Sequence, residues 1–334
     1  MLDARKSTIL RKVVAEHIET GQPVGSAHLV RDAAIDVSPA TVRADMAALE
    51  RDGYLTHPHT SAGRIPTDKG YRFFVDQLSP TGPLDARREE QVQAFFARAH
   101  HELEQMLRDT SRLLSTLTDS AAVVVAPSHE VLTVRSALLT RLGERAALLL
   151  VVLSNGAVEK HMLELAAGLA DDEVDLANNC LREALTGQRF GSLRPSGGCG
   201  QQAVDELVAG CFTLLTEAAP AAQGAEVYVG GTARMAEQFG AVDTVREVLA
   251  ILEQSFVVVS LLSEAVSHGQ SVSIGTENGM ESLAECSLVV APYEVGDEVV
   301  GTIGVLGPTR MNYSQALAAV AVVGERLSRQ LTSG

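Results

Sequence analysis

VSPATVRADMAALERDGYLTHPHTSAGRIPTDK, residues 37–69, is the stretch that decides the fold around it. Ser38 is a favourable helix start, because its side chain can cap free N–H groups and the proline after it is tolerated in the first turn. Helical spacing then places Val42, Met46 and Leu49 on one face. The sequence therefore predicts a capped helix with one apolar side.

The opposite face of this predicted helix is small and lightly charged. It carries Ala40, Ala44, Ala47 and Arg51, flanked by Thr41 and Arg43. Small side chains let a helix enter the major groove of DNA, where Thr41 and Arg43 would supply hydrogen bonds to base edges. The alternative is an alanine-rich helix packed on both faces, and this helix alone does not decide between the two interpretations.

A two-stranded wing is predicted after this helix, which ends at Gly53. Short strand segments at residues 54–57 and 64–65 are confined to sheet edges by the prolines beside them. The tip between them, residues 59–63, is polar and flexible, as a loop lying on a phosphate backbone requires. Thr67 can cap a further helix.

Two more helices are predicted upstream, at residues 5–20 and from Ser26 onward. The first has an apolar stripe that includes Ile9, Leu10 and Val13. Three helices with the third one presented, followed by a wing, form a winged helix-turn-helix.

Charge is distributed unevenly along the 334 residues, whose net charge is −15. Residues 1–78 carry ten Lys and Arg and ten Asp and Glu, so the acidic excess lies beyond them. A DNA-binding domain without net charge, attached to an acidic remainder, would bind DNA weakly unless the base sequence matches, which suits a sequence-specific repressor.

Compartment and redox state follow from composition. No apolar run approaches the roughly 20 residues of a membrane span, and MLDARKSTIL lacks the order of a signal peptide, so a cytoplasmic protein without membrane association is expected. The four cysteines show no metal-ligand spacing, which favours reduced, mostly buried thiols and no disulfide framework.

Beyond residue 78 the pattern predicts a linker, a helix and an interrupted antiparallel sheet. Apolar positions from Val92 to Leu117 follow a 4,3 spacing, which fits a dimer coiled coil or, as we favour, an amphipathic helix covering a sheet. Strand candidates lie at residues 121–127, 133–140, 145–153 and 157–162, and again after Ser271. Between them, helical segments around residues 174–185, 204–215 and 242–252 alternate with one strand candidate, EVYVGG, which indicates a domain inserted into the sheet.

The predicted fold class is α+β with several domains. The expected boundaries are 1–78 for the winged helix-turn-helix, 79–164 for a linker helix and the first half of the sheet domain, 165–264 for the insert, and 265–334 for the second half of the sheet domain.

Several segments resemble the HrcA family of bacterial heat-inducible transcription repressors. They are PVGSAHLV, SPATVRADMAALERDGYL and HTSAGRIPTDKGYRFFVDQL near the N-terminus, and SIGTENGMESLAECSLVVAPY and GTIGVLGPTRMNY near the C-terminus. The resemblance implies that the sheet domain is GAF-like and that the insert mediates dimerisation. It also implies a double-stranded inverted-repeat operator before chaperonin and DnaK-operon genes, and a GroEL chaperonin that keeps the repressor competent until heat draws it away.

One position departs from the family pattern. The family commonly has Asn where this chain has Ala44, so a contact expected there is missing and discrimination at one base pair is in question. The residues expected to contact DNA are Ser38, Thr41, Arg43, Ala44, His59, Thr60, Ser61, Arg64 and Lys69.

No catalytic or cofactor motif accompanies these features. The chain has no phosphate-binding loop, nucleophile elbow or zinc-protease helix, so we expect neither an enzyme nor a bound metal or cofactor. Two other functions stay open: a regulator that senses a ligand through the GAF-like domain, favoured by an apolar pocket between the sheet halves, and a winged-helix protein-interaction module, favoured by an acidic outer helix face.

Overall fold

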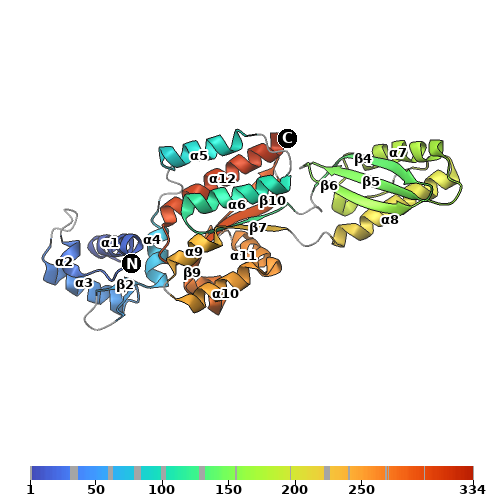
Figure 1. Cartoon of the computed structure of the whole chain (residues 1–334). Coiled ribbons are helices and arrows are strands. Elements are labelled where there is room, and N and C mark those ends of the chain that lie inside the picture. The colour runs from blue at the N-terminus through green and yellow to red at the C-terminus, as the bar shows by residue number, and fades with distance from the viewer. Residues whose placement is uncertain are drawn as a thin grey trace.

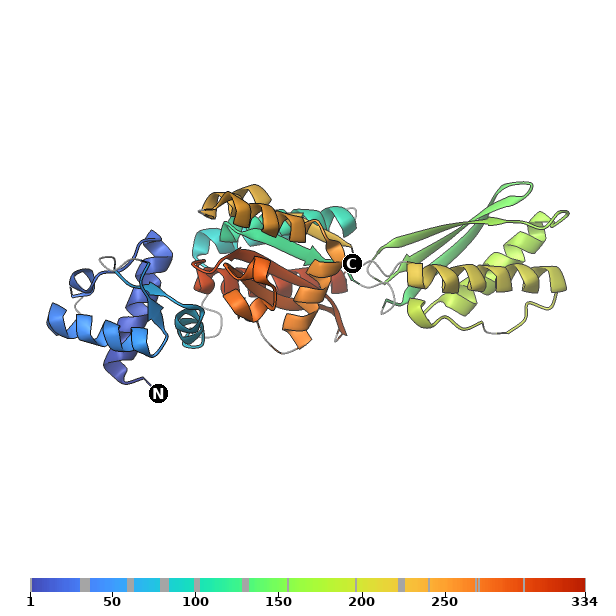
Figure 2. The ribbon, with the colours of Figure 1, turned by 90° about the horizontal axis from the view of Figure 1, so that it is seen from below.

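Three structural units follow one another in an elongated molecule (Figure 1). The computed structural model describes residues 2–30, 37–58, 63–78, 84–98, 103–127, 132–154, 156–195, 197–221, 226–239, 241–267, 269, 271–296 and 298–333. We call residues 2–78 the N-terminal unit, residues 84–127 with 226–333 the central unit, and residues 132–221 the distal unit. The central unit lies between the other two, and the view from below in Figure 2 shows the same order.

The N-terminal unit consists of helices around a small antiparallel ladder. Its elements are α1 (Ala4–Thr20), α2 (Ser26–Leu29), α3 (Pro39–Arg51), β1 (Leu55–Thr56), β2 (Ile65–Pro66) and α4 (Asp68–Val75). Leu55 pairs with Pro66 in the ladder. The predicted apolar stripe of α1 is fully buried at Ile9 and Val13, and it meets Leu49 of α3 in the core. The predicted helices and short strands are therefore confirmed in the described part of this unit.

The central unit is built on a five-stranded antiparallel sheet with the order β7-β3-β10-β9-β8. Its strands are β3 (Ala121–Val125), β7 (Val227–Gly230), β8 (Val272–Ile274), β9 (Cys286–Val295) and β10 (Glu298–Pro308). Helical layers cover both faces (Figure 1). Ala122 and Val124 of β3 contribute to the apolar cluster on one face, and Val123 contributes to the cluster on the other.

One helical layer contains α5 (Ala86–Phe96), α6 (Leu103–Thr118) and α12 (Tyr313–Ser333). The other contains α9 (Thr232–Gln238), α10 (Val242–Leu252) and α11 (Ser255–Ser267), with the short η3 (Gly275–Asn278) and η4 (Glu281–Leu283) before β9. Leu107, Leu114 and Leu117 of α6 are buried against the sheet. This confirms the amphipathic-helix interpretation for α6, because its apolar face is already occupied. One helix was predicted from Val92 to Leu117, whereas the structure has two, α5 and α6.

The distal unit is a three-stranded antiparallel sheet with helices on one side. It contains β4 (Val134–Gly143), β5 (Ala146–Leu153), β6 (Val158–Glu164), α7 (Asp171–Leu185), η2 (Phe190–Ser192) and α8 (Gln202–Ala221). Leu139, Leu149 and Val151 on one face of the sheet are buried beneath these helices. The other face is left open.

The grouping of the strands differs from the prediction. The strands at 133–140, 145–153 and 157–162 form their own sheet, and EVYVGG, expected in the insert, provides β7 beside β3. The separate unit therefore spans residues 132–221, so the boundaries at 165 and 264 are wrong. The two sheets differ in how their faces are buried. Strand β3 (AAVVV) is apolar throughout because both faces of its sheet are covered, whereas β6 (VEKHMLE) alternates because one face of its sheet is open.

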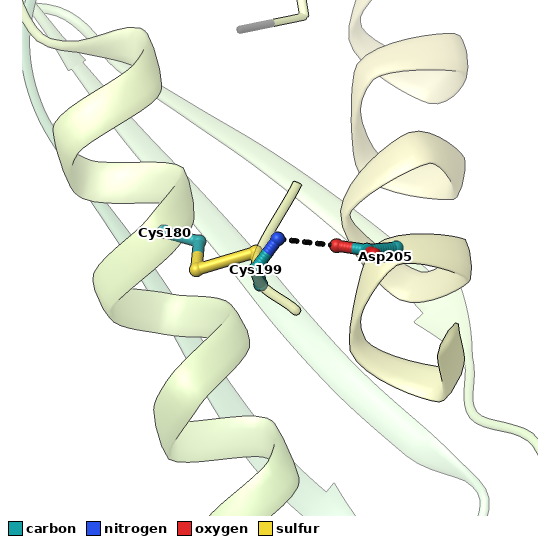
Figure 3. Close-up of a disulfide and its surroundings, with 3 residues drawn as sticks. All are labelled: Cys180, Cys199 and Asp205. Carbon is teal, nitrogen blue, oxygen red and sulfur yellow. Dashed lines mark hydrogen bonds between the residues drawn. A yellow bond between two sulfur atoms is a disulfide. The ribbon is translucent and has the colours of Figure 1, made fainter. Parts of the chain in front are cut away.

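Two of the four cysteines also differ from expectation. Cys180 on α7 and Cys199, in the glycine-rich loop before α8, form a disulfide with their Cα atoms 6.3 Å apart (Figure 3). The amide of Cys199 also donates a hydrogen bond to the Asp205 carboxylate. Cys211 and Cys286 are free and buried as predicted, and burial raises the pKa of each thiol to about 12.

Within the part of the chain that the structure describes, no single helix is both long and apolar enough to cross a membrane. Only α10 and α11 taken together reach the required length and composition, and they meet at an angle of 89°.

Candidate nucleic-acid interface

The start of α3 is fixed by its own hydroxyl groups. Ser38 is the N-cap and its Oγ accepts a hydrogen bond from the Thr41 amide at 3.2 Å, while the two side-chain oxygens lie 3.0 Å apart. Such a cap satisfies a free N–H group and leaves the positive end of the helix dipole toward solvent. Both residues lie where an anionic backbone could approach the helix.

The inner face of α3 is anchored by apolar packing and by one ion pair whose carboxylate is buried. Val42 and Leu49 are fully buried. Between them, the Asp45 carboxylate accepts two hydrogen bonds from Arg5 of α1, at 2.7 Å from Nε and 3.1 Å from Nη2. These hydrogen bonds raise the pKa of the Arg5 guanidinium above its ordinary value. The pair was missed from sequence because its members are 40 residues apart and no periodicity links them.

The outer face of α3 is exposed, as the helical spacing predicts. Arg43, Ala44, Ala47 and Arg51 are all solvent-exposed. Along the described helix, the one aspartate is buried against Arg5, and Glu50 is engaged elsewhere. The outer face therefore presents a shallow apolar strip between two cations, a shape and charge that fit a groove between phosphates.

Glu50 links the end of α3 to residues that flank the β1–β2 ladder. Its carboxylate hydrogen-bonds His57, and its Oε2 lies 2.8 Å from Nε of Arg64. Burial alone would raise the pKa of Glu50, but the hydrogen bond with His57 and the charge of Arg64 outweigh it, so the pKa is lowered. The Arg64 side chain is only 25% exposed. Its guanidinium is therefore held by a contact within the N-terminal unit.

Lys69 is likewise engaged inside the N-terminal unit. Its Nζ donates a hydrogen bond to the Asp52 carbonyl at 2.8 Å and lies 4.3 Å from the ring centroid of Tyr54. Thr67 adds a hydrogen bond to the Gly53 carbonyl at 2.7 Å. Gly53 itself has a φ of +78°, which favours glycine at this helix end. Together these contacts tie the start of α4 to the end of α3.

The predicted DNA-contacting residues thus fall into three groups. Ser38, Thr41, Arg43 and Ala44 lie together on α3, and Arg64 and Lys69 lie nearby but hold other parts of the unit. His59, Thr60 and Ser61 lie outside the described residues.

Comparison with known proteins assigns this architecture to a family. Residues 104–317 match the model of the HrcA protein C-terminal domain. The chain is 35% identical over 338 residues to the heat-inducible transcription repressor HrcA of Symbiobacterium thermophilum, covering 98% of each chain. The chain belongs to the HrcA family. The HrcA repressor of Nocardia farcinica is 38% identical over 336 residues, with 98% of this chain and 96% of the relative covered.

A solved structure also shares the fold. A crystal structure described as that of a hypothetical protein superimposes with a TM-score of 0.62 at 23% identity, covering 99% of this chain and 98% of the other. HrcA relatives match over their full length, so the N-terminal unit belongs to the family resemblance together with the sheet units.

Proposed function

We propose that the chain is a sequence-specific, heat-inducible transcriptional repressor whose N-terminal unit is a winged helix-turn-helix and whose central unit is GAF-like. The observation that carries the proposal is the outer face of α3, where exposed Ala44 and Ala47 lie between Arg43 and Arg51. In this proposal α3 enters the major groove and the wing lies on the adjoining backbone. The names of the HrcA relatives support a repressor rather than an enzyme.

Dimerisation through the distal unit is the second part of the proposal. Its open sheet face carries apolar side chains that pair across strands, Leu138 with Leu150 and Leu148 with Met162. Leu138 is 48% exposed and Met162 is 60% exposed. An uncovered apolar face of this kind is typical of an interface. A twofold axis through it would give the dimer two heads, which suits an inverted-repeat operator.

Support by the GroEL chaperonin completes the proposal. The resemblance implies this partner, and the central unit offers exposed apolar side chains at Phe256, 83% exposed, and Val242, 74% exposed. Chaperonins bind exposed apolar surface, so these residues mark where contact could begin. Heat would divert GroEL to unfolded proteins and relieve repression.

The ligand-sensing alternative has less support. A hollow of about 630 Å³ lies beside β7, but four charged side chains line it beside Val227 and Val229, so it is not the apolar pocket that this alternative requires; they are Glu104, Arg108, Arg112 and Glu226. The protein-interaction alternative required an acidic outer face on α3, whereas the exposed charges there are arginines.

A titration of the full chain tests the proposal. The probes are a duplex with the inverted repeat upstream of its own chaperone genes and a scrambled duplex, each with and without GroEL. We expect preference for the operator, strengthened by GroEL. Equal binding to both duplexes in both conditions would reject the repressor function, and an operator preference that GroEL leaves unchanged would reject the chaperone control alone.

A further inference from the structure

The N-terminal unit is joined to the central unit by an ionic contact between α4 and η3. Nε of Arg72 donates to Oε1 of Glu277 at 2.9 Å, and its Nη2 donates to the other carboxylate oxygen. The same Nη2 donates to the Val272 carbonyl at 2.9 Å. A guanidinium that donates two parallel hydrogen bonds to a carboxylate fixes the orientation of the two side chains as well as the distance between them. This pair joins segments 205 residues apart in the chain.

A second carboxylate completes the contact one turn earlier on α4. Oδ2 of Asp68 accepts hydrogen bonds from the amide of Thr276 at 3.0 Å and from its Oγ1 at 2.9 Å. Gly275 precedes this threonine with a φ of +56°, and a Cβ there would overlap the Asp68 carboxylate. Glycine at this position is thus required both by the backbone and by the neighbour. We call Asp68, Arg72, Gly275, Thr276 and Glu277 the α4 clasp.

The α4 clasp is backed by buried aromatic packing. Tyr71 of α4 is 3% exposed, and its ring centroid lies 6.0 Å from that of the fully buried Tyr313 at the start of α12. The Arg72 and Glu277 side chains are 28% and 33% exposed, so water screens their attraction only in part. Hydrogen bonding to Glu277 raises the pKa of Arg72 above its ordinary value, which keeps the guanidinium charged.

α4 therefore has two connections. On one side Lys69 and Thr67 tie it to the end of α3. On the other side the α4 clasp ties it to the central unit, from which the distal unit extends (Figure 1). Direct contacts thus run from the end of α3 through α4 to the central unit, and an ion pair between Arg189 of the distal unit and Glu298 of β10, with 2.6 Å between Nη2 and Oε1, continues them to the distal unit.

From this geometry we infer that the α4 clasp fixes the position of the N-terminal unit on the central unit. In a dimer it thereby sets the distance and orientation between the two DNA-reading helices, and so selects the half-site spacing of the operator. The inference rests on the proposed DNA-binding function. Arg72 and Glu277 act through α4 and do not touch DNA. A dimer whose heads are held rigidly gains affinity from its second half-site only when the spacing matches.

The test is a spacing series on the full-length protein. One set of duplexes carries the operator with zero to about five base pairs inserted between the half-sites, which rotates one half-site by up to about half a helical turn. A further duplex carries one isolated half-site. The variants are Glu277→Gln, Arg72→Ala and the charge-swapped double variant Arg72→Glu with Glu277→Arg. Glu325→Gln, which breaks an exposed ion pair with Arg329 on α12, is the matched control.

The wild type and the control should bind the native spacing best and lose affinity steeply on insertion. Glu277→Gln and Arg72→Ala should keep the half-site affinity within about twofold and reduce the preference for native spacing by about tenfold, and the charge swap should restore part of it. An unchanged spacing profile would overturn the inference. Equal loss of half-site affinity would overturn it too, because the contact would then serve only the stability of the head.

Failure of the proposed function is recognised separately. It would appear as a wild type that binds operator and scrambled duplex equally. Small-angle X-ray scattering without DNA then tests the clasp alone: the single variants should broaden the distribution of intramolecular distances relative to the wild type and Glu325→Gln. Identical distributions from proteins with unchanged circular dichroism would overturn the positioning role.

Discussion

Arg43 is the side chain on which base recognition is expected to depend most. It is exposed on the outer face of α3, where its exposed neighbours Ala44 and Ala47 offer no polar side chain. Arg43→Ala should weaken operator binding by about 1–3 kcal/mol and bring it closer to binding of scrambled DNA. Fluorescence anisotropy with both duplexes measures the change. Arg98→Ala on the central unit is the control, and an unaltered ratio of the two affinities would exclude base recognition by Arg43.

Arg64 is paired with a carboxylate of its own unit, which the sequence did not predict. Sequence placed it beside the wing as a cation for the phosphate backbone, and it lies there, but paired with Glu50. The pair could not be predicted because the packing of α3 against the β1–β2 ladder, rather than sequence spacing, brings residues 50 and 64 together. If phosphate recruits this guanidinium from Glu50, Arg64→Ala should weaken binding to all duplexes alike and flatten its salt dependence. A loss confined to the operator would place Arg64 in a groove instead.

The lowered pKa of Glu50 predicts a pH dependence of stability. A carboxylate with a lowered pKa in the folded state stabilises the protein fully above its ordinary value of 4.5, and this stabilisation is lost as the pH falls through the folded-state pKa. Glu50→Gln should therefore lose less stability than the wild type when the pH is lowered below about 4.5. Urea unfolding across this pH range measures the difference, with Glu90→Gln as the exposed control. Parallel pH profiles for wild type and Glu50→Gln would contradict the assignment.

At the scale of elements, local patterns predicted most helices and strands but not their partners. Val242 to Leu252 was predicted as a helix and forms α10 with those limits. Periodicity records which face of a segment is buried, and it carries no information on what buries it. Two strand groups that look alike locally therefore entered different sheets, and α9 and α11 were not recognised as separate helices. Disulfide pairing and the α4 clasp also depend on segments that only the tertiary fold brings together.

The disulfide between α7 and the loop before α8 should stabilise the distal unit. Closing a loop with a sequence separation of 19 restricts the unfolded chain, which corresponds to about 3 kcal/mol in the loop-entropy description. Cys199→Ser should lower the free energy of unfolding by up to this amount, measured by urea denaturation under oxidising conditions. Dithiothreitol should destabilise the wild type and leave Cys199→Ser unchanged. Equal free energies of unfolding for the oxidised and reduced wild type would show that the disulfide contributes nothing to stability.

The open face of the distal unit predicts the oligomeric state. Leu138→Glu combined with Met162→Glu places two charges where a partner would exclude water, so the dimer dissociation constant should rise about hundredfold or more. Both positions are half-exposed, so the subunit itself should stay folded. Sedimentation equilibrium measures the constant, and Val299→Glu, on a 49% exposed site of the central sheet, is the control. An intact dimer in the double variant would move the interface elsewhere.

At the scale of the whole molecule, the proposed function gives each of the three units a separate task. The N-terminal unit at one end carries the candidate DNA-reading face, the distal unit at the other end carries the candidate dimer face, and the central unit connects them (Figure 2). Composition indicated this division only in part: the acidic excess outside residues 1–78 separated the head from the body, but not the two parts of the body. Under the proposed function, this arrangement would make DNA binding depend on contacts far from DNA.

Titration of wild type, Ala47→Glu and Ala94→Glu with operator and scrambled duplexes tests the central claim most directly. Ala47 lies exposed on the outer face of α3 and Ala94 lies exposed on α5, so the same change is made on a reading helix and on a control helix. Glutamate is compatible with a helix but repels phosphate. The account predicts that Ala47→Glu abolishes operator preference while Ala94→Glu binds like the wild type. Wild-type operator binding by a folded Ala47→Glu protein would contradict it.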